Sequence, residues 1–269
     1  MLTTNPQFAR ATVNMIWKQF FNLGIVDPVD SFDMARQDPK NPPPAPWTVQ
    51  PANADLLNAL AADFAKNGFD LKQLMRSLAR SSAYQLSSRF DGEWKASYTP
   101  YFARKYVRLM TAQQVHDAVS QATQVFGNYR RRDLVYNTEL PPIRFWTEAA
   151  TPEDIGGEAK AFAQTFGLAN REQFDRQTGG SILQAIMLMN SPFVTRRVVA
   201  DNGSLVDQLV KSAKSSAEIV DEMYVFTLSR HPLPQEKELA VSWIEKDRRQ
   251  GAEDLQWSLL NKLDFIFNY

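Results

Sequence analysis

Three carboxylates lie within seven residues in the segment GIVDPVDSFD, at Asp27, Asp30 and Asp33. Two carboxylates can serve as acid and base in glycoside hydrolysis at any sequence spacing. A calcium loop needs oxygens at positions one, three and five and glycine at six, and the segment lacks this pattern. Asp27 before Pro28 instead suits a helix start, with Asp27 as cap and Asp30 near exposed backbone N–H groups. We expect structural roles, and name Asp27 and Asp30 as the catalytic residues if the chain is a hydrolase.

The two histidines, His116 and His231, form no recognisable metal or catalytic pattern. Asp117 follows His116, but adjacent helix residues point about 100° apart, which argues against action on one small target. Helical metal ligands recur three or four residues apart, and the residues four before and four after His116 are Ala112 and Ser120. We therefore expect no metal site and no cofactor, with His116 at the surface or hydrogen-bonded and His231 in a loop.

Composition excludes several other kinds of chemistry. Cysteine is absent, which excludes disulfides, thiolate metal sites and c-type haem attachment. Thirty basic residues balance thirty acidic ones, so charge gives no reason to expect nucleic acid or an anionic membrane as partner. The basic and aromatic run 129–132 could contact phosphate, but we interpret it as a solvated loop. No apolar run approaches the ~18 residues of a membrane span, and the N-terminus lacks a signal-peptide pattern.

The elements that must position these residues are mostly helices. Apolar residues recur at helical spacing in 5–24, 55–68 and many later segments. Three pairs have the spacing of a capping box: Asp70 with Gln73, Thr111 with Gln114, and Ser215 with Glu218. Short strand patterns occur only at 133–137 and 143–149. The sequence predicts an all-α, irregular multi-helix fold with at most a minor β element.

The chain is long enough for one large domain or two modest ones. With 44% hydrophobic residues in 269, it can bury a sizeable core. We predict one domain over 1–269, built of two helical lobes, 1–126 and 157–269, that are joined by 127–156. Six prolines between positions 39 and 51 indicate an extended loop, which Trp47 is expected to anchor.

Several long stretches together resemble one family. They are NPQFARATVNMIWKQFFNLGIVDPVDSFD at 5–33, DLLNALAADFAKNGFDLKQLMRSLARSSAYQLSS at 55–88, FARKYVRLMTAQQVHDAVSQAT at 102–123, SILQAIMLMNSPFV at 181–194 and DLQWSLLNKLDFIFNY at 254–269. In this order they resemble domain of unknown function 1553, the planctomycete secreted domain. The resemblance implies the C-terminal domain of an exported bacterial multidomain protein, often with a c-type cytochrome domain upstream. It implies no established activity and no catalytic residues. The family's usual histidine after a proline pair is missing from the lengthened loop at 41–60.

Two functions remain open on the sequence. The first is a non-catalytic helical interaction or scaffold domain that contacts other domains of the same parent chain, such as the cytochrome domain. The parent would be exported to the cell envelope or periplasm. The alternative is a hydrolase acting on polysaccharide through Asp27 and Asp30, with glycan stacking on Trp47, Trp94 or Trp146. Because no catalytic constellation stands out, we expect the chain not to be an enzyme.

Overall fold

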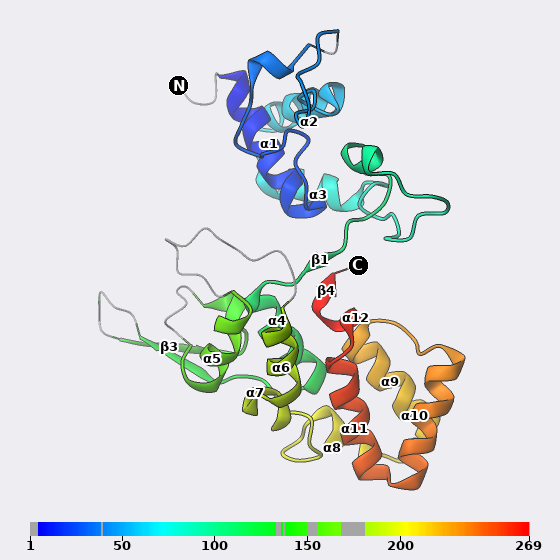
Figure 1. Cartoon of the computed structure of the whole chain (residues 1–269). Helices are drawn as coiled ribbons and strands as arrows, with labels where there is room; N and C mark the ends of the chain where they lie inside the picture. The colour runs from blue at the N-terminus through cyan, green and yellow to red at the C-terminus, as the bar shows by residue number, and fades with distance from the viewer. Residues whose placement is uncertain are drawn as a thin grey trace. The chain divides into compact units, whose positions relative to one another are not determined.

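The computed structural model describes residues 5–38, 40–132, 136, 138–149, 155–167 and 181–268, and it is mainly helical, as predicted (Figure 1). The chain divides into two compact units, unit 1 up to Arg108 and unit 2 from Leu109. This division lies earlier in the chain than the predicted connection between lobes at 127–156. Residues 109–126, which were predicted to lie in the first lobe, belong to unit 2.

Unit 1 is a small helical unit built around α1 (Pro6–Phe21), α2 (Ala54–Lys66) and α3 (Leu71–Arg80). The labels α1 and α2 lie beside one another in Figure 1, and these two helices pack together. Two 3₁₀ helices, Met34–Arg36 and Ala96–Tyr101, lie in the connecting segments. Apolar residues of all three α-helices make one core, whose members include Val13, Trp17, Phe21, Leu57, Phe64, Leu74 and Leu78.

The helices of unit 1 begin at capping residues that the sequence indicates. Asn5 accepts a hydrogen bond from the backbone N–H of Gln7 at 2.9 Å, with Pro6 at the first helical position. Asp70 accepts from the backbone N–H groups of Lys72 at 2.8 Å and Gln73 at 3.1 Å. These bonds satisfy N–H groups that have no partner inside the helix. The helix start predicted at Asp70 is confirmed.

Replacing Asp70 by alanine is expected to lower the free energy of unfolding by about 1 kcal/mol, because the cap of α3 is lost. Asp70→Asn is the matched control, since asparagine also caps and should change stability by only a few tenths of a kcal/mol. Urea denaturation followed by circular dichroism measures both. Equal losses in the two variants would show that charge, and not capping, is the contribution of Asp70.

Unit 2 contains most of the remaining elements. Its helices are α4 (Ala112–Thr123), α5 (Gly157–Thr165), α6 (Ile182–Asn190), α7 (Pro192–Thr195), α8 (Leu205–Lys211), α9 (Ser216–Leu228), α10 (Pro234–Lys246), α11 (Arg248–Leu260) and α12 (Leu263–Ile266). The predicted capping boxes at Thr111 and Ser215 are present, at the starts of α4 and α9. A third box, Ser181 with Gln184, starts α6 and was not foreseen.

Strands are few and short among the described residues. The strand β2 (Tyr129–Arg132) pairs antiparallel with β3 (Glu139–Ile143), with an irregularity after Tyr129. The strand β1 (Arg108–Leu109) pairs with β4 (Phe267–Asn268). The strand predicted at 143–149 is wrong for most of its length, since Trp146–Glu148 is a 3₁₀ turn. The strand predicted at 133–137 falls on residues that, except Tyr136, lie outside the described ones.

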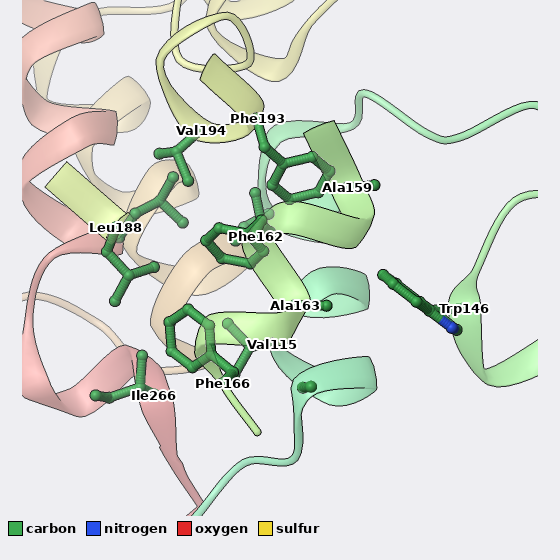
Figure 2. Close-up of a cluster of buried hydrophobic side chains, with 14 of the residues drawn as sticks. Val115, Trp146, Ala159, Phe162, Ala163, Phe166, Leu188, Phe193, Val194 and Ile266 are labelled. Atoms are coloured by element: carbon green, nitrogen blue, oxygen red, sulfur yellow. The ribbon is translucent and has the colours of Figure 1, made fainter. Parts of the chain in front are cut away.

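Two apolar clusters form the core of unit 2. In the first, Phe162 of α5 lies in the middle of the labelled side chains in Figure 2, with its ring centroid 4.9 Å from Phe166 and 4.8 Å from Phe193. The second cluster joins α8, α9, α10 and α11. There Gly251 permits a close helix approach, because a Cβ at this position would lie 2.3 Å from the carbonyl oxygen of Trp243.

Candidate functional site

The segment with the three carboxylates is held in shape by two buried side-chain amides, which bind its backbone. The side chain of Asn14, fully buried in α1, donates to the carbonyl oxygens of Val26 at 2.8 Å and Val29 at 3.0 Å. It also accepts from the backbone N–H of Val26 at 2.9 Å. The side chain of buried Gln50 donates to the carbonyl oxygen of Asp27 at 3.2 Å. The turn is therefore held by its backbone, and not by its carboxylates.

The carboxylates themselves point to solvent. Asp27, Asp30 and Asp33 are all exposed. The predicted helix start at Asp27 is wrong, because residues 27–28 form a bend and residues 29–30 a turn, and no helix begins there. The cap belongs to Asp33, which accepts from the backbone N–H of Ala35 at 2.9 Å at the start of Met34–Arg36. Nothing in these contacts gives Asp27 or Asp30 a catalytic environment, and their role as an acid and base pair stays a prediction.

A hydrogen-bonded chain of three polar side chains lies in unit 2, at Asp117, His116 and Tyr129. His116 is completely buried. Its Nδ1 lies 2.7 Å from Oδ1 of Asp117, and its Nε2 lies 2.7 Å from the hydroxyl of Tyr129. His116 is therefore hydrogen-bonded, which is one of the two states expected from the sequence, and adjacent Asp117 binds its imidazole directly.

Asp117 also binds a segment that is remote along the chain. Its carboxylate accepts from the backbone N–H groups of Trp146 at 2.6 Å and Thr147 at 3.0 Å. Burial alone would raise the pKa of the Asp117 carboxyl, but hydrogen bonds from His116, Thr147 and Trp146 outweigh burial and lower the pKa. The carboxylate is therefore ionised at neutral pH and joins α4 to the 3₁₀ turn Trp146–Glu148.

Aromatic rings and one arginine enclose this chain of side chains. The imidazole of His116 stacks on Phe193 at 4.9 Å between centroids and meets Trp146 edge-on at 5.2 Å. The guanidinium of Arg197 lies 3.9 Å from the centroid of the Phe193 ring and donates to the carbonyl oxygens of Val125 and Phe193. Burial raises the pKa of the Tyr129 phenol and lowers the pKa of Arg197.

The carboxylate of Asp117, the imidazole of His116 and the hydroxyl of Tyr129, bonded in this order, determine which nitrogen of the imidazole carries the proton. An ionised Asp117 favours a proton on Nδ1, which leaves Nε2 to accept from the hydroxyl of Tyr129. Catalysis by such a chain requires that a substrate reach the imidazole or the hydroxyl. The imidazole has no exposed surface and is covered by aromatic rings. The arrangement therefore satisfies buried polar groups and fixes β2 and the 146–148 turn on α4.

The three tryptophans named as sugar platforms differ in exposure. Trp146 is only 2% exposed and belongs to the core, so its assignment as a surface platform is wrong. Trp94 is partly buried, and the guanidinium of Arg104 lies 4.0 Å from its ring centroid. Trp47 is exposed, with the guanidinium of Arg36 at 5.0 Å. Trp47 therefore contacts Arg36 but is not buried in the core, contrary to the expectation that it anchors the proline-rich loop.

The described residues contain no group of three or more His, Asp or Glu side chains placed to hold a metal ion. Across the same part of the chain, none of the helices combines the length and apolar character needed to span a membrane. Among the described polar side chains of the interior, Asn14 binds the backbone and His116 binds two other side chains, whereas the indole N–H groups of Trp17 and Trp146 are buried without a hydrogen-bond partner.

These features define a helical protein of two units in which buried polar side chains hold turns onto helices. The comparisons then place it. The chain belongs to the family described as PSD1, protein of unknown function (DUF1553), which matches residues 1–244. The resemblance seen in the sequence is confirmed over that range. No curated protein and no solved structure matched the chain.

Proposed function

We propose that this chain is a non-catalytic interaction domain that binds another domain of its parent polypeptide through an apolar stripe on α6. Four apolar side chains form the stripe, and they are strongly exposed: Ile182 80%, Leu183 67%, Ile186 46% and Met189 41%. The last three follow Ile182 by one, four and seven positions, which places all four side chains on one face of the helix. This stripe is the observation that carries the proposal.

The stripe differs from ordinary surface apolar residues. Single exposed apolar side chains are common on soluble proteins and need no explanation. Here, however, the whole of α6, ILQAIMLMN, carries no charged residue. Its other face supplies Leu188 to the core, as Figure 2 shows, so the stripe is not the core-facing side. A helix with two apolar faces is typical of one that is covered on both.

The perturbed ionisable groups support a non-catalytic role, because protein contacts account for them. Asp117 and Tyr129 are bonded through His116, as described above. In the C-terminal helices, the Glu236 carboxylate binds the guanidinium of Arg230 and the ammonium of Lys262. These bonds lower the pKa of Glu236 to about 2. Neither cluster needs a substrate to explain its electrostatics.

The proposed partner is an apolar helix or groove. A charged surface would lose its hydration against α6 without gaining an ion pair. The multidomain architecture that the resemblance implies would place this partner on the same polypeptide, in a parent that we propose is exported to the cell envelope or periplasm. Linkage on one chain also raises the effective concentration of the partner, so a small contact suffices.

The test uses the absence of cysteine. Ile186→Cys provides a unique site for an environment-sensitive fluorophore in the middle of the stripe. When the remaining part of the parent polypeptide is added, we expect the emission to shift to shorter wavelength as the label leaves water. Leu239→Cys, on an exposed apolar position of α10, is the matched control and should not respond.

Leu183→Glu is the second test. A carboxylate in the stripe should prevent binding of the partner, and because residue 183 is exposed, the substitution should leave the stability of the fold nearly unchanged. No response at residue 186 would overturn the proposal, and so would an equal response at residue 239. A shift that depends on the concentration of the 269-residue chain alone would overturn the named partner, because it would indicate pairing between two copies.

A further inference from the structure

Unit 1 contains a hollow of about 430 Å³. It lies between the residues that follow α1, the 3₁₀ helix Ala96–Tyr101 and the segment 104–107, and its polar lining consists of Asn22, Ser88, Thr99, Arg104, Lys105 and Tyr106. Sites for small molecules usually measure about 300–1,000 Å³. The hollow therefore has room for one small ligand.

The lining includes two cationic residues, Arg104 and Lys105, and the charged group of each lies over an aromatic ring. The guanidinium carbon of Arg104 lies 4.0 Å from the centroid of Trp94, and Nζ of Lys105 lies 4.8 Å from the centroid of Tyr84. Such contacts orient a cation but do not neutralise its charge. Within the part of the chain that the structure describes, neither cation forms an ion pair with a carboxylate. The lining thus contains two cationic residues that have no carboxylate partner among the described residues, and it contains no acidic residue.

The end of α1 offers another explanation for these cations, because the last carbonyl groups of a helix attract positive charge. Their effect equals roughly half an elementary negative charge. Arg108 already serves this end of the helix, since its guanidinium donates to the carbonyl oxygen of Gln19 at 2.8 Å. The two positive charges of Arg104 and Lys105 are therefore larger than the partial negative charge at the end of α1.

The remaining lining is polar and partly fixed. The hydroxyl of Tyr106 donates to the carbonyl oxygen of Thr99 at 2.7 Å, which holds its ring as a wall. Burial raises the pKa of the Tyr106 phenol, so this wall stays neutral. Asn22, Ser88 and Thr99 add neutral donors and acceptors suited to hydroxyl groups.

We infer that this hollow binds a small organic oxyanion, in which a carboxylate, sulfate ester or phosphate ester on a hydroxylated body of sugar size contacts Arg104 and Lys105. Arginine and lysine are the side chains that recognise these groups. The inference concerns unit 1 and does not depend on the α6 stripe, which lies in unit 2.

The test is isothermal titration of the 269-residue chain with matched sugars. Glucuronate, glucose 6-sulfate and glucose 6-phosphate are the charged probes, and glucose and inorganic phosphate are the controls. We expect at least one charged sugar to bind with a Kd of about 1 mM or lower, and at least about tenfold more tightly than glucose. The preferred probe identifies which oxyanion the site takes.

A variant with both Arg104→Gln and Lys105→Gln should weaken this binding at least about tenfold. The control carries Lys72→Gln and Arg76→Gln on the exposed side of α3, which removes the same charge from the same unit. Circular dichroism checks that both variants remain folded, and Arg104→Lys with Lys105→Arg should preserve binding. Failure of every charged sugar to bind would overturn the inference. So would equal binding of glucose, equal weakening in both variants, or inorganic phosphate binding as tightly as glucose 6-phosphate.

Discussion

His116→Ala should lower the free energy of unfolding of unit 2 by about 3–5 kcal/mol. The substitution removes a ring that has no exposed surface and that packs against Phe193 and Trp146. It also leaves the hydroxyl of Tyr129 without the acceptor at 2.7 Å. Urea denaturation followed by circular dichroism measures the loss, and hydrogen exchange at α4 and β2 assigns it to this unit.

The other histidine provides the matched control. His231 is exposed in a loop, so His231→Ala should change stability by no more than about 0.5 kcal/mol. His116→Phe separates the contribution of ring packing from that of the hydrogen bonds, because phenylalanine keeps a ring in the core but cannot bind Asp117 or Tyr129. We expect it to cost about 1–3 kcal/mol. If His116→Ala and His231→Ala had the same effect, the buried hydrogen-bonded chain would not exist in solution.

Asp117→Asn should destabilise the protein by about 1–3 kcal/mol at neutral pH, because hydrogen bonds to a charged acceptor are lost. The effect should depend on pH. The pKa of Asp117 is lower in the folded protein than its ordinary value of 3.8. Its contribution to stability is therefore complete above about pH 4 and disappears as the pH falls through the lower, folded-state pKa.

The difference in unfolding free energy between wild type and Asp117→Asn should accordingly shrink below about pH 4. Urea denaturation at a series of pH values between about 2 and 7 tests this. Asp254→Asn is the matched control, because it makes the same chemical change at an exposed position of α11, outside the buried network. A constant difference across the series would contradict a lowered pKa at Asp117.

Local signals in the sequence predicted the helix starts well. Asp70, Thr111 and Ser215 are caps because their side chains bond backbone N–H groups two or three residues ahead. Such contacts are decided by neighbouring residues alone. The start predicted at Asp27 failed because Asn14, from another segment, holds the carbonyl groups of this turn. No local pattern specifies that contact, although an amide on the buried face of α1 is a signal that could have been used.

His116 was expected to be at the surface or hydrogen-bonded, but its partners in unit 2 were not predicted, for a related reason. His116 and Asp117 were judged by the directions of their Cβ atoms on the helix, which do diverge. Their contact depends on Tyr129, Trp146 and Thr147, which arrive from later segments and bind the outer ends of both side chains. Sequence spacing within one helix cannot show that two side chains share partners from elsewhere. Burial of Trp146 escaped prediction for the same reason.

The hydrogen bonds from Asp117 to Trp146 and Thr147 also bear on how many residues can be inserted between the bonded positions. The bond to Trp146 joins two residues that are 29 positions apart. The entropic cost of closing such a loop grows only with the logarithm of its length. Doubling the number of residues between the two ends would cost only about 0.6 kcal/mol more. The number of residues between Asp117 and Trp146 is therefore weakly constrained, whereas the carboxylate of Asp117 that joins the ends of this segment is strongly constrained.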